Sequence, residues 1–135
     1  MTMQGDELEK KYSTPQENFW AGDFGEEYIS RNGGKDLLAS NLKFFTSALK
    51  HADNLSSCLE LGANIGMNLR ALDLLYPHID LRAVEINPKA TKVLREFVSE
   101  ENVFEGSIFD APTSKKSELV LIKTVLIHIN PEMLN

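Results

Sequence analysis

The sequence predicts an α/β fold, in which a parallel sheet is flanked by helices, and three observations lead to this class. Strand-like and helix-like segments alternate from residue 55 onward. A glycine-containing loop, Glu60–Gly66, joins the first apolar strand to the following helix. The 135 residues suffice for one domain with a single hydrophobic core. Alternating strands and helices build right-handed units around a parallel sheet, so the expected architecture is Rossmann-like.

Two parts are expected to precede this sheet. Residues 1–14 show little periodicity and are predicted to form a flexible N-terminus. Residues 15–54 combine an aromatic-rich segment with the first helix. Four aromatic side chains alternate with two glycines between residues 15 and 32, which favours a lid or a short helical cap. From Lys35 to Ala52, apolar residues at helical spacing predict a helix.

The sheet and its helices are expected between residues 55 and 135. The predicted strands are Ser57–Leu61, Asp80–Ile86, Val103–Gly106 and a segment within Ser117–Val125. The predicted helices are Ile65–Leu75 and Pro88–Val98, with another that begins at Pro131. The last strand contains a continuous apolar run, which is typical of a strand that is buried on both faces.

Composition excludes several classes of protein. The formal net charge is -6 and the two lysine pairs are too short to form a basic patch, so no nucleic-acid partner is expected. No apolar run has the length of a membrane span, and the polar N-terminus lacks a secretory signal. A cytoplasmic protein with no membrane partner is therefore expected. The single cysteine, Cys58, permits no intrachain disulfide, and no metal site is expected.

Open α/β sheets bind ligands at the carboxyl ends of their strands, and the loop Glu60–Gly66 follows the first of these ends. A glycine at position 62 lets the backbone approach a ligand, and one at position 66 lets the following helix pack against the strand. The residues of this loop that we expect to contact a cofactor are Glu60, Gly62, Ala63, Asn64 and Gly66.

The next two strand ends carry matching features. Glu85 and Ile86 end the second strand, where a carboxylate accepts hydrogen bonds from both ribose hydroxyls of an adenosine cofactor. After the third strand, Ser107 and Ile108 would enclose an adenine ring, and Asp110 would accept from its amino group. Lys123, at the tip of the fourth strand, is expected to face the cofactor or the substrate.

The loop itself discriminates between adenosine cofactors. Binding of NAD prefers three glycines, whereas here Asn64 lies between Gly62 and Gly66. The carboxylate of Glu60 would face a pyrophosphate unfavourably, but it suits the ammonium group of S-adenosylmethionine. A phosphate-binding Walker loop is excluded because no Gly-Lys-Ser/Thr follows. The favoured cofactor is therefore S-adenosylmethionine.

These motifs also carry a family resemblance. Glu60–Gly66 and Val84–Asn87 resemble the first two motifs of class I S-adenosylmethionine-dependent methyltransferases. The segments Phe19–Asn32, Glu60–Asn68 and Lys123–Pro131 resemble more specifically the pseudaminic acid biosynthesis-associated methylases. The resemblance covers about Thr14–Leu134. It implies a methyltransferase that acts on a small molecule, sugar or glycan precursor related to nonulosonic acids, a substrate that is inferred from the family alone.

Five side chains are candidates for roles on the acceptor side. His128 is expected to be the general base for a hydroxyl acceptor, with Asp23 as the second candidate. Trp20 and Tyr28 would close over the sulfonium, since aromatic faces attract cations. Arg31 would bind an acidic group of the substrate. Each has a structural alternative: local packing for the histidine, a turn for the aspartate, core anchoring for the aromatics and surface exposure for the arginine.

The resemblance implies further strands after the fourth, so the sheet is expected to be truncated there. The fourth strand would then lie near an open edge, which a homodimer would cover. Two alternatives to an active methyltransferase stay open. One is a truncated cofactor-binding module without independent catalysis, and the other is a domain that binds NAD or a nucleotide sugar.

Overall fold

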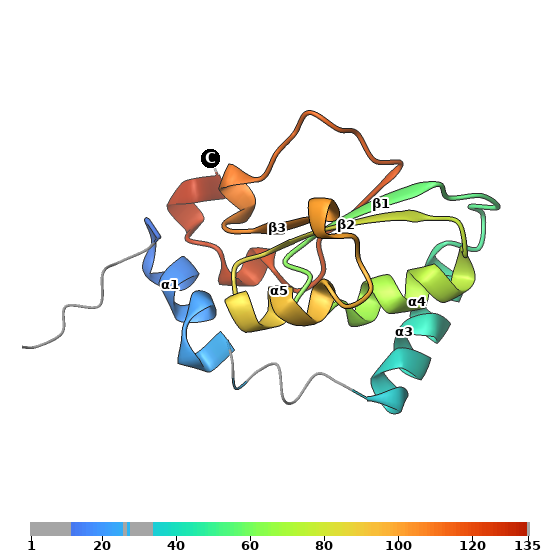
Figure 1. Cartoon of the computed structure of the whole chain (residues 1–135), viewed down its shortest axis with the longest axis horizontal. Coiled ribbons are helices and arrows are strands. Elements are labelled where there is room, and N and C mark those ends of the chain that lie inside the picture. The colour runs from blue at the N-terminus through green and yellow to red at the C-terminus, as the bar shows by residue number, and fades with distance from the viewer. Residues whose placement is uncertain (1–11, 26, 28–33, 135) are drawn as a thin grey trace, which may run out of the picture.

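A four-stranded parallel sheet with strand order β3-β2-β1-β4 is the centre of the computed structural model, which describes residues 12–25, 27 and 34–134 (Figure 1). The strands are β1 (Ser57–Leu61), β2 (Asp80–Glu85), β3 (Val103–Glu105) and β4 (Leu119–Leu121). The helices include α1 (Pro15–Ala21), α3 (Lys35–Ala48), α4 (Met67–Leu75) and α5 (Pro88–Leu94). Short 3-10 turns are η1 (Glu100–Asn102), η2 (Ile108–Asp110), η3 (Leu126–His128) and η4 (Pro131–Leu134). The predicted Rossmann-like α/β class is confirmed.

The strand register decides which side chains share a face. Cys58 of β1 pairs with Leu81 of β2 and with Leu119 of β4, and these three apolar residues contact one hydrophobic core. Two residues further on, Glu60 pairs with Ala83 of β2, so the Glu60 side chain points to the same face. All four strands run in one direction, so their carboxyl ends meet at one edge of the sheet.

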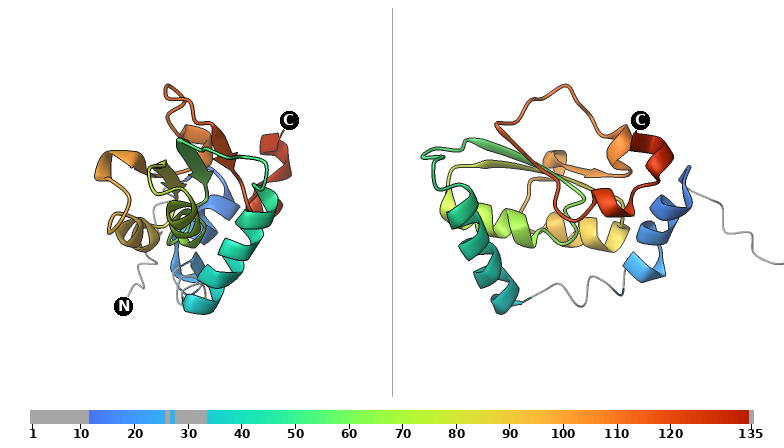
Figure 2. Two further views of the ribbon diagram at one scale, coloured as in Figure 1. Left: turned by 90° about the vertical axis from the view of Figure 1, so that its right-hand side faces the viewer. Right: turned by 180° about the vertical axis from the view of Figure 1, so that it is seen from behind.

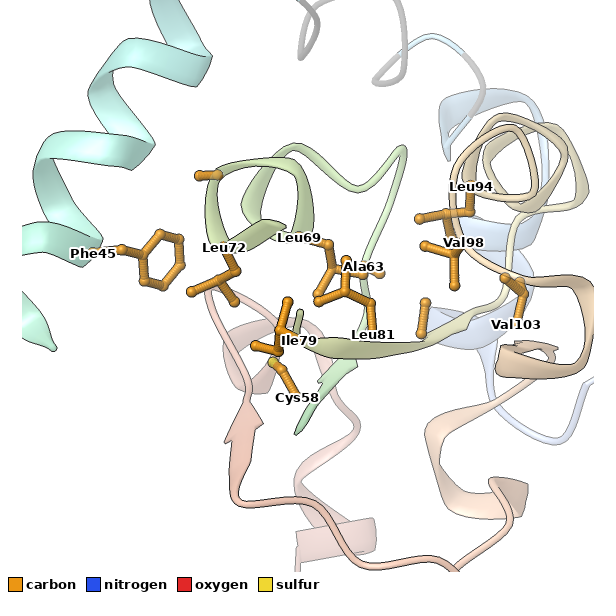
Figure 3. Packing of buried hydrophobic residues seen from close by; sticks show 12 residues of the cluster. Phe45, Cys58, Ala63, Leu69, Leu72, Ile79, Leu81, Leu94, Val98 and Val103 are labelled. Carbon is orange, nitrogen blue, oxygen red and sulfur yellow. The ribbon is translucent and has the colours of Figure 1, made fainter. Parts of the chain in front are cut away.

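The core lies between this face and the helices. Helices α3, α4 and α5 all lie on one side of the sheet (Figures 1 and 2). Leu69 and Leu72 of α4 and Leu94 of α5 are fully buried against it, and Phe45 of α3 packs beside Leu72 (Figure 3). Removing one such leucine from a packed core costs about 2–5 kcal/mol, so these contacts hold the helices in place.

Cys58 lies inside this core and is 0% exposed. Burial raises the pKa of its thiol to about 12. A thiol of this kind is not a nucleophile at neutral pH, because the reactive species is the thiolate. Cys58 is therefore a core residue.

The prediction that the fourth strand is buried on both faces is wrong. Leu119 and Leu121 pack against the core, but Val120 between them is 53% exposed and Ile122 is 39% exposed. In the part of the chain that the structure describes, β4 is an edge strand whose outer face no α-helix covers. The apolar run thus predicted the strand correctly, but it did not show that, among the described residues, only one face of the strand is covered.

The cap begins earlier than predicted. Thr14 is the N-cap of α1: its Oγ1 accepts from the Glu17 backbone N–H at 3.2 Å, and its own N–H donates to the Glu17 carboxylate at 3.1 Å. Pro15 follows at the first helical position, where its missing N–H costs nothing. Tyr12 is tied to Asn18 by two hydrogen bonds of 3.2 and 2.9 Å. The residues just before Pro15 therefore belong to the cap. The predicted short helix of the cap is confirmed as α1.

Two predicted helices end sooner than the apolar pattern suggests. The helix expected to reach Ala52 ends at Ala48, and a turn follows in which the Ala52 N–H donates to Leu49 O at 2.8 Å. The helix expected to reach Val98 ends at Leu94, and η1 then leads into β3. Within the described residues, no helix is long and apolar enough to cross a membrane.

Candidate functional site

A cavity of about 230 Å³ opens at the carboxyl edge of the sheet. It is enclosed by the loop after β1, the ends of β2 and β3, the segment after β4, and residues of α1, α3 and α4. Eight of the ten residues predicted to contact a cofactor line it, namely Gly62, Ala63, Asn64, Glu85, Ile86, Ser107, Ile108 and Lys123. The meeting of parallel strand ends is the reason why residues so far apart in the sequence come together.

Glu85 at the tip of β2 is a buried acidic group of the cavity. It is only 8% exposed, and burial raises the pKa of its carboxyl. One oxygen, Oε2, accepts from the Asn64 backbone N–H at 2.6 Å, and Oε1 accepts from the Asn87 backbone N–H at 2.8 Å. A carboxylate offers about four lone-pair sites, so each oxygen retains capacity for a further donor in the cavity.

Asn64 adopts a backbone conformation that favours glycine, with φ 51°. Asparagine tolerates this left-handed region better than most residues, and here it directs the Asn64 N–H to the Glu85 carboxylate. The loop after β1 is thus held to the end of β2 by a hydrogen bond to a carboxylate, which is stronger than one between neutral groups.

Glu60 does not line the cavity, contrary to the prediction that it contacts the cofactor directly. Its carboxylate is 1% exposed and lies behind the loop, where Oε1 accepts from Asn68 Nδ2 at 2.7 Å. Its other oxygen, Oε2, and Asn68 Oδ1 are buried without a hydrogen-bond partner among the described residues. Burial, and then the nearby charge of Glu85, raise the pKa of Glu60 from 4.5 to about 8, whereas the Asn68 hydrogen bond lowers it.

This shift predicts a pH dependence of stability. The folded protein holds a proton on Glu60 up to about pH 8, whereas the unfolded chain releases it near pH 4.5, so stability falls as pH rises between these values. In a Glu60→Gln variant the charge is absent and the Asn68 hydrogen bond is retained. We expect its free energy of unfolding, measured by urea titration, to fall less between pH 5 and 8 than that of the wild type. The exposed Glu101→Gln variant is the control, and equal slopes for Glu60→Gln and wild type would contradict the shift.

The two loop glycines have different roles. Gly62 lines the cavity with φ +77°, and an added Cβ would lie 2.5 Å from Val125 Cγ2, so no side chain fits. Gly66 has φ +82° but does not line the cavity; an added Cβ would lie 2.6 Å from both Leu94 and Phe97. Gly66 was predicted to contact the cofactor and to let the next helix pack against the strand; in the structure it lies outside the cavity lining and instead leaves room for Leu94 and Phe97 of the α5 region.

The third strand end forms the opposite wall. Ser107 is 2% exposed, and its Oγ accepts from the Phe109 N–H at 3.3 Å, which starts the η2 turn. Ser107 and Ile108 face the cavity as predicted. Asp110, at the end of the same turn and predicted to accept from an adenine amino group, is exposed and does not line the cavity.

The segment after β4 contributes Lys123, Val125 and His128. Lys123 Nζ lies 5.6 Å from the centre of the Phe44 ring on α3. The His128 ring packs against Trp20 of the cap, with ring centroids 4.7 Å apart and an interplanar angle of 61°. Both rings line the cavity, so the histidine is packed locally and also faces the space where an acceptor would lie.

Asp23, the second predicted base, is exposed and does not line the cavity. It follows Gly22, the C-cap residue of α1. Asp23 is therefore withdrawn as a catalytic candidate. Tyr28 and Arg31, the other residues proposed from this segment, lie outside the described residues.

Three amide side chains of the cavity come from helices that the sequence did not connect to the site. Asn41 of α3 is 4% exposed, Asn68 lies in the first turn of α4, and Gln16 in α1 has a buried Oε1 without a partner among the described residues. Asn41 carried a usable signal, because it is a polar residue on the apolar stripe that also contains Leu38 and Phe45. The other two follow a helix start, where polar residues are common and therefore uninformative.

Solved structures that are similar to this chain include several methyltransferases. A methyltransferase from Methanococcus maripaludis, described as S-adenosyl-L-methionine-dependent, aligns with a TM-score of 0.62 and 12% identity over 80% of this chain and 52% of its own. The sugar N-methyltransferase KedS8 from a Streptoalloteichus species aligns with a TM-score of 0.57 and 17% identity, over 77% of this chain and 40% of its own. CalS10 is an amino pentose methyltransferase from Micromonospora echinaspora that was solved with S-adenosylmethionine bound. It aligns with a TM-score of 0.52 and 16% identity, over 76% of this chain and 43% of its own.

The chain thus has the fold of S-adenosylmethionine-dependent methyltransferases and spans about half or less of the length of these three proteins. No protein-family model and no curated protein sequence matches it.

Proposed function

We propose that the cavity binds S-adenosylmethionine and that the chain is a methyltransferase domain. The observation that carries this proposal is the Glu85 carboxylate, which is buried at the tip of β2, anchored by two backbone amides and open to the cavity. A carboxylate in this position accepts two adjacent hydroxyl donors, as a ribose provides. Ser107 and Ile108 on the neighbouring strand end then lie where the base of the same nucleoside would be enclosed.

A buried acceptor beside the loop fits the amino-acid end of this cofactor. Asn68 lines the cavity, and its Oδ1 is buried without a donor among the described residues. A buried acceptor without a donor costs about 1–3 kcal/mol, which a ligand ammonium group would recover. Lys123 on the opposite side supplies a positive charge for a carboxylate. These residues would therefore hold a zwitterionic group.

NAD fits the same loop poorly. The middle glycine of a dinucleotide loop lets the backbone approach a pyrophosphate, whereas Asn64 places a side chain there while keeping a glycine-like φ of 51°. The only cation of the segment after β4 that faces the cavity, among the described residues, is Lys123. The site is thus poorly equipped for two phosphates and better suited to a ligand without any.

Titration calorimetry with S-adenosylhomocysteine and with NAD tests the cofactor proposal. We expect S-adenosylhomocysteine to bind with a dissociation constant below about 100 µM, which corresponds to a binding free energy of roughly -5.5 kcal/mol. We expect NAD to give no heat at millimolar concentration. Binding of NAD alone, or of neither ligand at millimolar concentration, would exclude the proposal.

We propose that the acceptor is a small molecule or a sugar, and more specifically a precursor related to nonulosonic acids such as pseudaminic acid. The resemblance of Phe19–Asn32 and Lys123–Pro131 to the pseudaminic acid-associated methylases supports this choice. The sugar and amino pentose substrates in the names of KedS8 and CalS10 point in the same direction.

When bound, the cofactor supplies a methyl group on a sulfonium for in-line transfer, and the protein's contribution is mainly alignment. In our proposal His128 accepts the proton of an acceptor hydroxyl, because its imidazole faces the cavity from η3. Trp20 holds that ring by an edge contact, and the aromatic cap closes this side of the cavity.

A further inference from the structure

One buried amide connects the N-terminal cap to the sheet edge that carries the cavity. Asn87 follows β2 and is 2% exposed. Its side-chain Nδ2 donates to Trp20 O at 3.1 Å and to Gly22 O at 3.5 Å, at the end of α1. Its Oδ1 accepts from the N–H groups of Lys89 and Ala90 at 3.0 and 3.2 Å and so caps α5. A single side chain thus joins two helices that are distant in the sequence.

The cap contact is made at the residue whose ring forms part of the cavity wall. Asn87 binds the backbone carbonyl of Trp20, and the indole of the same residue lines the cavity and packs against His128. In two views, α1 lies beside the C-terminal segment that contains η3 (Figures 1 and 2). A displacement of the Trp20 carbonyl therefore moves the indole and removes the packing partner of His128.

The turn after α1 packs closely against the hydrogen bond between Asn87 Nδ2 and Trp20 O. Gly25 is buried beside it, and a Cβ at this position would overlap the Trp20 carbonyl oxygen and lie 2.8 Å from Asn87 Nδ2. The glycine therefore lets the turn after α1 close onto the amide. The cap is held by a donor on one side and by close backbone packing on the other.

The same residue also reaches the ribose-binding carboxylate of our proposed function. The Asn87 backbone N–H donates to Glu85 Oε1 at 2.8 Å. We propose that Asn87 is a positioning residue: it fixes the cap at a set distance from the sheet edge and thereby places Trp20, and through it His128, over the cavity. Only the meaning of that position for methyl transfer rests on the proposed function.

Trp20 provides the measurement, because it is the single tryptophan of the chain. In Asn87→Ser the hydroxyl still caps α5, since serine is as good an N-cap as asparagine, but the amide donor is lost. In Gly25→Ala the donor is kept and the added methyl group pushes the turn away from it. In both variants, without ligand, we expect Trp20 emission at longer wavelength and stronger quenching by acrylamide, with the far-ultraviolet circular dichroism of the wild type.

Asn102→Ser is the matched control. Asn102 is a partly buried amide that donates to Asp80 Oδ1 at 3.0 Å, at the opposite end of β2 from the cavity. Its replacement should leave Trp20 emission unchanged. Wild-type emission and quenching in Asn87→Ser and Gly25→Ala would overturn the proposal, as would an equal change in Asn102→Ser.

A failure here is distinguishable from a failure of the proposed function. The fluorescence is measured on the ligand-free protein, so absence of S-adenosylhomocysteine binding would exclude the cofactor and leave the cap contact standing. If Asn87→Ser proves too unstable to purify, Gly25→Ala decides the question alone, because it leaves the α5 cap intact.

Discussion

Glu85→Ala should weaken the binding of S-adenosylhomocysteine about 10- to 150-fold, since a hydrogen bond to a charged group contributes about 1.5–3 kcal/mol. The carboxylate is buried at the cavity, so no other group can take its place at the tip of β2. The Asn64 and Asn87 backbone N–H groups would also lose their acceptor. Stability should therefore fall together with affinity, and calorimetry and urea unfolding should be measured on the same variant.

Glu105→Ala is the control that separates the loss of affinity from the loss of stability. Glu105 pairs with Glu85 in the register of β2 and β3 and is also a hydrogen-bonded carboxylate, because it accepts from Thr91 Oγ1 at 2.7 Å. It does not line the cavity. The control variant should lose stability but bind S-adenosylhomocysteine as the wild type does. Unchanged affinity in Glu85→Ala would remove Glu85 from the binding site.

Gly66→Ala should destabilise the fold by about 2–4 kcal/mol, from the sum of backbone strain and overpacking. The residue has φ +82°, and an added Cβ would lie 2.6 Å from Leu94 Cδ2 and from Phe97 Cζ. Leu94 is fully buried, so its side chain cannot shift away from the added methyl group without disturbing the packing around α5. Chemical denaturation of the ligand-free protein measures the loss.

Gly34→Ala is the matched substitution. Gly34 also has positive φ, at +122°, but an added Cβ would meet no heavy atom within 4 Å. Its ψ of 166° makes its backbone at least as unfavourable for alanine as that of Gly66, whose ψ is 27°, so the loss in Gly66→Ala beyond that in Gly34→Ala is a lower bound on the packing cost. A loss below about 1 kcal/mol in Gly66→Ala would show that close packing is not the reason for the glycine.

The strand ends were predictable because they depend on local patterns. Apolar runs mark the strands, and parallel strands place their carboxyl ends at one edge, so Gly62, Glu85, Ser107 and Lys123 could be assigned to one site before the structure. The choice against a dinucleotide also came from a local feature, the Asn64 that replaces a glycine. Each of these inferences needs only the identity of a residue and its place relative to a strand.

The burial of individual residues, and hence which of them reach the cavity, was not predictable from local patterns. Glu60 lies behind the loop and Gly66 faces α5, because the pleat of β1 and the packing of Leu94 and Phe97 decide which atoms reach the cavity. Asp110 was predicted to face the adenine, but the η2 turn leaves it exposed.

The sequence by itself therefore determined the α/β class, the edge of the sheet that carries the site, and the loop Glu60–Gly66 that closes it. The tertiary structure alone decided the contributions from helices, including Asn41, Asn68 and the cap held by Asn87. The physical reason is that the positions of strands along the chain follow from short-range patterns, whereas the approach of a helix to the cavity depends on packing between elements that are distant in the chain.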